Sequence, residues 1–269
     1  REAMGYNKPY LEQFWIFLKN IVTKFDWGVS DKLFLGRDVL GIFTQRLPAT
    51  VIVNLYSILF AIPIGIALGV FDALKKNTWV DYLISTLTMV VISVPSFVYA
   101  FLIQYIFSFK LGWLPFLMKS GTDWFSPAMF VSMLPAIMSL AFGTIAGFTR
   151  TTRAELTEVL TSEFMLLART KGLTKAQATV RHALRNCFVV VVPAIIGEFV
   201  SILGGSLIIE RIFSIPGVGR LTIDAINGQD YPIFMLTTCF YTAIGLAASL
   251  VVDISYGLID PRIRMGSKK

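Results

Sequence analysis

Five long stretches of the chain are almost free of charged residues. They cover residues 47–71, 83–109, 127–149, 188–209 and 233–257, and the only charges within them are Glu198 and Asp253. A helix needs about 20 apolar residues to cross roughly 30 Å of hydrocarbon, and the stretches lack the period-two alternation of membrane strands. The pattern therefore predicts an all-α polytopic membrane protein with five transmembrane helices between residues 47 and 257.

The composition agrees with this prediction and excludes several other classes. Hydrophobic residues make up 55% of the chain and charged residues 15%, whereas soluble domains carry about 25% charge. The net charge of +7 comes from basic residues scattered through the loops, which indicates membrane orientation and lipid headgroup contact rather than nucleic acid binding. Cys187, Cys239 and the single His182 lack the spacing of a metal site, so we expect no metal.

The basic residues divide the loops into two sets. Loops 72–82, 150–187 and 258–269 hold 13 Lys or Arg in 61 residues, and loops 110–126 and 210–232 hold four in 40. The positive-inside rule places the first set, with the C-terminal tail 258–269, in the cytoplasm. Residues 1–46 would then be external. Because the chain starts at Arg1 without a signal peptide, we expect a further membrane helix before it, giving six spans.

The external segment contains a helical stripe of apolar residues within 10–22. The stripe consists of Leu11, Phe14, Trp15, Leu18, Ile21 and Val22. Such a face suits a helix that lies on the membrane surface or packs against the outer mouth of the bundle, and ordinary packing explains it equally well.

Proline and glycine add two expectations about the spans. Pro63, Pro95 and Pro135 lie within predicted spans, where each removes a backbone hydrogen bond and favours a kink. The small residues of IGIALG (64–69) predict a close contact with another helix.

The long basic loop 150–187 contains the start and stop signals of two helices separated by a glycine. Thr161 or Ser162 can cap a first helix, which Gly172 ends in a left-handed turn. Thr174 and Gln177 form a capping-box pattern for a second helix over 175–186. Phe164, Leu167 and Ala168 give the first helix one apolar face, which either a partner protein or the ends of the chain's own spans would cover.

Four ordered segments resemble a known family. ARTKGL (168–173) followed by RHALRN (181–186) resembles the coupling loop, or EAA loop, of bacterial ABC importer permeases. Three further segments, TRTTRAELTEVLTSEF (149–164), ERIFSIPGVGRLTIDAINGQDYP (210–232) and LVVDISYGLIDPRIR (250–264), resemble the dipeptide and oligopeptide permease family, first-subunit type. GYNKPYLEQFWIFLKNIVTKFDWGVS (5–30) is similar to the external segment after that family's first membrane helix. The resemblance covers nearly the whole chain.

The resemblance implies a type I ABC importer permease fold, with residues 47–257 as the permease domain, in the bacterial cytoplasmic membrane. It implies that the helix before Gly172 docks on a cytoplasmic ATPase. The resemblance carries this role over to Ala168, Gly172 and the flanking Arg169, Lys171 and Leu173. Glu163 at the helix start, with Phe164 and Leu167 of its apolar face, completes the expected coupling residues. Leu166 and Leu167 stand where the name EAA implies Glu and Ala, so position 166 makes no salt bridge here.

The implied partners supply the energy. No Gly-Lys dipeptide occurs, so the chain has no P-loop, and ATP and Mg would bind to partner subunits. The resemblance implies two ABC ATPase subunits, a second homologous permease in a heterodimer, and an extracytoplasmic peptide-binding protein. The chain would form half of the translocation pathway for di- or oligopeptides by alternating access, without being an enzyme itself.

Pathway and gate residues are less constrained by the pattern. Glu198 is the first candidate because a carboxylate within a span normally faces a cavity or a partner; Asn54, Gln104 and Ser201 are further candidates, with hydrogen bonding between helices as the alternative for all four. A possible outer gate comprises Pro216, Gly217, Gly219 and Asp224, which could instead belong to a surface helix. A secondary transporter, or an importer of nickel chelates or sugars, is the alternative function.

Overall fold

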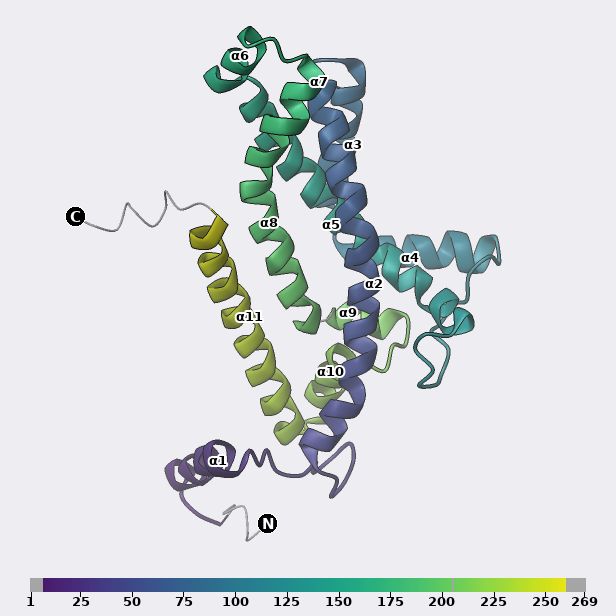
Figure 1. The fold of residues 1–269 in the computed structure, drawn as a ribbon. Helices are drawn as coiled ribbons and strands as arrows, with labels where there is room; N and C mark the ends of the chain where they lie inside the picture. The colour runs from purple at the N-terminus through teal and green to yellow at the C-terminus, as the bar shows by residue number, and fades with distance from the viewer. Residues whose placement is uncertain (1–6, 205, 260–269) are drawn as a thin grey trace, which may run out of the picture.

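The computed structural model describes residues 7–204 and 206–259, apart from the side chain of Lys175. From residue 260 onward, the expected cytoplasmic tail lies outside these ranges. Within them the chain is helical, and its only β-type pairing is an isolated bridge between Val29 and Asp38. The four longest elements are α2 (Val39–Leu74), α5 (Pro127–Leu160), α8 (Leu184–Ser201) and α11 (Tyr231–Ile259). They run along the long axis of the molecule, with α6 near one end and α1 at the other (Figure 1).

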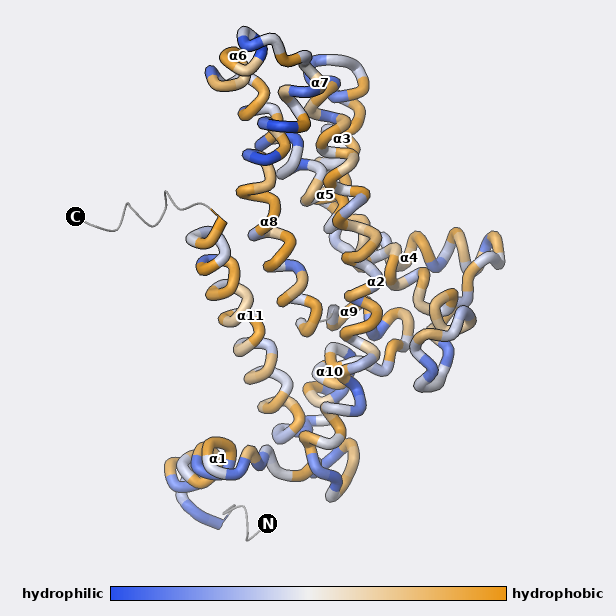
Figure 2. The backbone as a smooth tube through the Cα atoms, in the orientation of Figure 1, coloured by the Kyte–Doolittle hydropathy of each residue, from blue (hydrophilic) through white to orange (hydrophobic). Residues whose placement is uncertain are grey.

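The predicted spans correspond to four long apolar helices and one bent pair. By length and composition, Val39–Leu74, Pro127–Leu160, Ala176–Gly204 and Tyr231–Ile259 can each cross a membrane, and Figure 2 shows that hydrophobic residues dominate them. The fifth predicted span, 83–109, is not straight. It is divided into α3 (Trp79–Ser93) and an arm of α4 (Ser96–Ile103) and η2 (Gln104–Lys110), bent by 100°.

Pro95 accounts for the bend. It lies between α3 and α4 and has no N–H to continue the helix, and Val94 before it is extended with ψ 128°, as residues before proline prefer. Pro63 and Pro135, in contrast, lie inside the continuous helices α2 and α5. The sequence therefore predicted a distortion at all three prolines, and only Pro95 ends a helix.

Two helix boundaries also differ from the prediction. α2 begins at Val39 rather than at residue 47, because the Asp38 carboxylate accepts a hydrogen bond from the Gly41 N–H at 2.6 Å and caps the helix. The predicted helix 175–186 is not separate. α7 (Lys175–Ala178) and the π-helical turn η3 (Thr179–Ala183) continue directly into α8, because no glycine or proline interrupts residues 175–192.

The IGIALG motif makes the close contact that it predicts. A Cβ atom on Gly65 would lie 2.8 Å from the Ile145 carbonyl oxygen, and one on Gly69 would lie 2.6 Å from the Thr149 carbonyl oxygen. These distances are too short for any side chain, so glycine lets α2 pack directly on the backbone of α5. The Thr149 hydroxyl also donates to the Gly65 carbonyl at 3.2 Å.

Buried charges join the two basic loops at the α6 end. The Arg153 guanidinium on α5 lies 2.6 Å from the Asp81 carboxylate at the start of α3 and 3.2 Å from the Asp72 carboxylate at the end of α2. Both aspartates are buried. Loops 72–82 and 150–187 therefore lie on the same side of the bundle, as their shared basic character predicted.

Another buried carboxylate fixes the opposite end. Asp230, just before α11, accepts hydrogen bonds from the Ser30 hydroxyl at 2.5 Å and from the Leu33 N–H at 3.0 Å. It therefore ties the N-terminal segment to the corner between α10 (Val218–Gly228) and α11.

Candidate functional site

The helix expected to couple to a partner, α6 (Glu163–Thr170), lies near the end of the molecule farthest from α1 (Figure 1). Ser162 occupies its N-cap position, but its hydroxyl donates to the Val159 carbonyl instead of accepting from the helix. Gly172 follows the helix with φ +89°, the left-handed conformation that ends helices without strain when the residue is glycine. The predicted helix and its glycine stop are both present.

The predicted capping box follows immediately. The Thr174 N–H donates to the Gln177 side-chain oxygen at 3.0 Å, and the Gln177 N–H donates to the Thr174 hydroxyl at 3.3 Å. This reciprocal pair satisfies two backbone donors that would otherwise lack partners at the start of a helix. The turn between α6 and α7 is therefore defined by its own residues.

α6 divides its apolar residues between two sides. Met165 and Ala168 are buried and pack into a cluster that includes Leu156 and Ala178. Phe164, Leu166 and Leu167 are 41%, 65% and 55% exposed. Ala168 therefore faces the protein, whereas the other two residues of the predicted face point outward together with Leu166. The exposed residues Phe164, Leu166 and Leu167 are called the docking face below.

The remaining coupling candidates surround this face. Glu163, Arg169, Lys171 and Gly172 are exposed, and Leu173 is half-buried against the same cluster as Ala168. Within the described ranges, no α6 side chain forms a hydrogen bond or ion pair with another helix. α6 is held to the bundle by apolar packing on one side only.

Glu198 lies in a groove between α5 and α8. The groove has a volume of about 380 Å³, and its α5 wall includes Gly143, Thr144 and Gly147. A Cβ atom on either glycine would meet nothing within 4 Å, so this wall is open. Among the described residues, none forms an ion pair or hydrogen bond with the Glu198 carboxylate. The groove therefore has one carboxylate in an otherwise uncharged lining.

The other three pathway candidates lie elsewhere. The Asn54 amide on α2 donates to the Thr50 carbonyl at 2.8 Å, and Ser201 is exposed at the end of α8. Gln104 is buried and donates to the Phe116 carbonyl at 2.9 Å, which fastens the loop after η2 to the bent arm. The fold does not gather these side chains around Glu198 in one lining.

The gate candidates form the start of α10, and a buried carboxylate organises them. The Glu210 carboxylate, on α9 (Leu207–Ile212), accepts from the Thr50 hydroxyl at 2.8 Å and from the Arg220 N–H at 3.0 Å. The Thr50 hydroxyl oxygen in turn accepts from the Val218 N–H at 2.8 Å. These bonds cap α10 and attach it to α2. Asp224, in the middle of α10, is partly exposed and lies 3.6 Å from the Arg220 side chain.

Sequence reasoning missed Glu210. Burial raises the pKa of this carboxyl group, and the hydrogen bonds from Arg220, Thr50 and Gly219 oppose that rise. A Cβ atom on Gly217 would lie 2.5 Å from the Thr50 hydroxyl oxygen and closer still to Glu210. The glycines of IPGVG therefore leave room for the carboxylate, and Gly217 is the local signal that could have indicated it.

Comparisons with known proteins show the family to which the chain belongs. Residues 42–265 match the family described as "binding-protein-dependent transport system inner membrane component". The chain is 36% identical to the dipeptide transport system permease protein DppB of Bacillus subtilis (strain 168), over 97% of this chain and 81% of that protein. It is 33% identical to the glutathione transport system permease protein GsiC of Escherichia coli (strain K12), over 98% of this chain and 83% of that protein.

Solved structures of ABC transporters share the fold. A crystal structure of an amino acid ABC transporter aligns with a TM-score of 0.59 and 19% identity, covering 80% of this chain and 92% of that chain. An inward-facing structure of the MetNI methionine ABC transporter aligns with a TM-score of 0.59 and 15% identity, covering 80% and 97%. Together with the sequence matches, these confirm the predicted fold and functional class. The chain belongs to the family of binding-protein-dependent transport system inner membrane components, as the membrane permease and not the ATPase of an ABC importer.

Proposed function

We propose that this permease forms one half of a peptide-import pathway, with a second homologous permease as the other half, and that α6 is the helix through which a cytoplasmic ATPase drives it. The observation that carries the proposal is the division of α6. Met165 and Ala168 hold the helix against the bundle, while the docking face is left uncovered. An apolar surface of this kind on a short, well-defined helix suits a protein partner.

The cargo is inferred from the relatives. Their names specify dipeptide and glutathione transport, and both ligands are short peptides with charged ends. In the groove, the Glu198 carboxylate would face the amino group of a bound peptide. Among the described residues this carboxylate has no basic partner of its own. Asn54 and Ser201 would add polar contacts if the second permease closes the pathway over them.

ATP and Mg would be bound by two ABC ATPase subunits on the α6 side, which is the cytoplasmic side. An extracytoplasmic peptide-binding protein would deliver cargo to the end at which α1 and α10 lie. There Pro216, Gly217 and Gly219 begin a helix attached to both α2 and α9, and Asp224 is partly exposed on it. We propose that α10 forms part of the outer gate.

The test compares two exposed apolar residues at the same end of the molecule. Leu167→Glu places a charge on the docking face, whereas Val180→Glu places one on η3, where Val180 is 66% exposed. Each variant is assembled with its ATPases and reconstituted in proteoliposomes with the binding protein. We expect Leu167→Glu to abolish ATPase copurification and ATP-dependent uptake of radiolabelled dipeptide, and Val180→Glu to retain both.

The ATPase contact and the peptide cargo can be contradicted independently. Normal copurification and uptake with Leu167→Glu would exclude α6 as the ATPase contact. Intact, ATP-dependent transport of a nickel chelate or a sugar, with no competition by di- or oligopeptides, would exclude peptide cargo and leave the coupling role in place.

A further inference from the structure

The amphipathic helix α1 (Tyr10–Lys24) lies across the end of the bundle opposite α6, beside the start of α11 (Figure 1). Hydrophobic and hydrophilic residues alternate along it (Figure 2). One part of its apolar face packs on the protein. Phe17 meets the buried Trp27 edge to face, with ring centroids 6.4 Å apart, and Ile21 packs against the same cluster.

The rest of the apolar face is uncovered. Leu11, Trp15 and Val22 follow one another at intervals of four and seven residues, which places them on one side of a helix, and they are 85%, 67% and 82% exposed. Lys19, four residues after Trp15, borders this side of the helix, Lys24 lies away from it, and both are exposed. Tryptophan and other apolar residues on one side, bordered by exposed lysine, are typical of helices that lie in the headgroup region of a bilayer.

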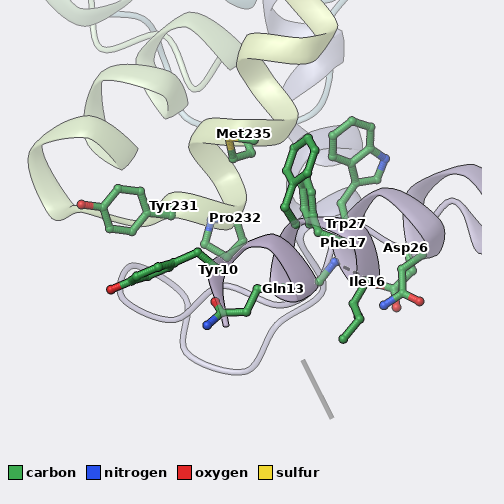
Figure 3. A pocket seen from close by; sticks show the side chains of 12 residues that line it. Tyr10, Gln13, Ile16, Phe17, Asp26, Trp27, Tyr231, Pro232 and Met235 are labelled. Carbon is green, nitrogen blue, oxygen red and sulfur yellow. Dashed lines mark hydrogen bonds between the residues drawn. The ribbon is translucent and has the colours of Figure 1, made fainter. Parts of the chain in front are cut away.

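A cleft separates α1 from α11. Its volume of about 420 Å³ is within the range of about 300–1,000 Å³ for small-molecule sites. Its lining consists largely of apolar and aromatic side chains. Figure 3 shows Tyr10 and Phe17 of α1, Trp27, and Pro232 and Met235 of α11 around it. Its walls therefore join an interfacial helix to a membrane-spanning one.

We propose that α1 lies in the headgroup region of the leaflet opposite α6, and that the cleft between α1 and α11 holds an acyl chain of a phospholipid from that leaflet. The apolar surface continues from Met235 along α11, where Leu246, Leu250 and Ile254 are 62–63% exposed in a helix that spans the membrane. On a membrane-spanning helix such a surface suits contact with lipid, and a lipid chain in contact with it would reach the cleft without leaving hydrocarbon. The exposed lysines of α1 complement anionic headgroups. The inference does not depend on the cargo.

The position of α1 is tested with two adjacent residues. Val22 and Thr23 are separated by one step of about 100° on the helix and lie at the same level along it. Val22→Cys and Thr23→Cys are spin-labelled in the complete transporter, in phosphatidylglycerol-containing nanodiscs, after Cys187→Ala and Cys239→Ala remove the free cysteines. We expect the label at position 22 to be several-fold more accessible to oxygen than to a water-soluble nickel complex, and the label at position 23 to show the reverse. Shielding of position 22 from both reagents would indicate a protein partner and overturn the proposal.

The cleft is tested with a phosphatidylglycerol whose acyl chain carries a diazirine. After illumination, we expect adducts on peptides containing residues 10–27 and 231–235, and their loss when excess unlabelled phosphatidylglycerol is added. Met235→Trp, which fills the cleft, should reduce these adducts several-fold. Met89→Trp, a change at an exposed position on α3, should not reduce them. Labelling of α11 at Leu246 to Ile254 without adducts in the cleft would refute the lipid site, whether or not the Met235 variant folds.

Discussion

Gly217→Ala provides the sharpest test of the buried cap on α10. The added Cβ atom would lie 2.5 Å from the Thr50 hydroxyl oxygen and closer still to the Glu210 carboxylate. Neither group can move away freely. Thr50 is bonded to both the Glu210 carboxylate and the Val218 N–H, and Glu210 is also bonded to the Arg220 N–H. The methyl group must therefore displace the carboxylate or separate α10 from α2.

The expected cost combines two effects. Overpacking a well-packed site costs about 1–3 kcal/mol, and leaving one buried donor or acceptor unsatisfied costs about 1–3 kcal/mol. With at least one bond lost from the Thr50–Glu210–Arg220 set, we expect a destabilisation of about 2–6 kcal/mol. By the scaling for soluble domains of 150–250 residues, a loss of 3 kcal/mol lowers Tm by roughly 6–12 °C.

The measurement uses the buried thiol of Cys187, which is 1% exposed. The transporter is heated in nanodiscs with a maleimide, and alkylation of the Cys187 peptide is followed by mass spectrometry. Gly245→Ala serves as the control, because a Cβ atom there would meet nothing within 4 Å and Gly245 lies within the helix α11. Gly245→Ala should leave the midpoint temperature of Cys187 alkylation unchanged or raise it slightly, since alanine favours the helix by up to about 1 kcal/mol.

A Gly217→Ala midpoint equal to that of Gly245→Ala would refute the reasoning, because it would mean that the carboxylate is not held where the added methyl group must lie. Glu210→Ala in the Gly217→Ala background separates the two causes. If the clash with the carboxylate dominates, the double variant should be less destabilised than the sum of the two single variants.

Three further changes test the other contacts. Arg153→Leu leaves the buried Asp72 and Asp81 without their shared cation and should cost about 3–5 kcal/mol in the same alkylation assay, with partial recovery on adding Asp81→Asn. Gly69→Val inserts a side chain where even a Cβ atom would lie 2.6 Å from the Thr149 carbonyl, so we expect loss of folded protein in membranes, whereas Gly147→Ala, with open space around it, should express normally. Thr174→Ala removes half of the capping box and should cost about 1 kcal/mol, seen as faster hydrogen exchange at residues 175–178; unchanged exchange would mean that the box contributes little.

The parts of the fold that the sequence predicts well depend on local signals. The spans follow from runs without charge, the stop after α6 follows from Gly172, and the capping box follows from two residues three positions apart. The small residues of IGIALG predict that α2 makes a close helix contact, although they do not identify α5 as the partner. In each case the residues that carry the signal also make the contact, so no knowledge of distant partners is required.

The bend at Pro95 is a feature that local sequence signals do not predict. Pro63, Pro95 and Pro135 look alike in the sequence, but only Pro95 interrupts a helix. Contacts made after the chain has turned favour the bent form there. The Tyr99 hydroxyl donates to the Val91 carbonyl across the break, and Gln104 on η2 bonds to the Phe116 carbonyl. The sequence shows the missing N–H of a proline but not the tertiary bonds that decide whether the helix bends.

Glu210 and Asp230 show the same limit at the end that contains α10. They also distinguish the two ends of the molecule. Each is a carboxylate in a predicted external loop, where a charge is ordinarily solvated, yet each is buried and bonded to residues about 160 and 200 positions away. They tie α10 to α2 and the N-terminal segment to α11. α6, in contrast, is held by apolar packing alone among the described residues. Buried, hydrogen-bonded carboxylates fix one geometry, because displacing them leaves polar groups without partners, whereas an apolar contact can slide at lower cost. We therefore expect the end containing α10 to move as a rigid unit, and α6 to shift against the bundle if an ATPase acts on it as proposed.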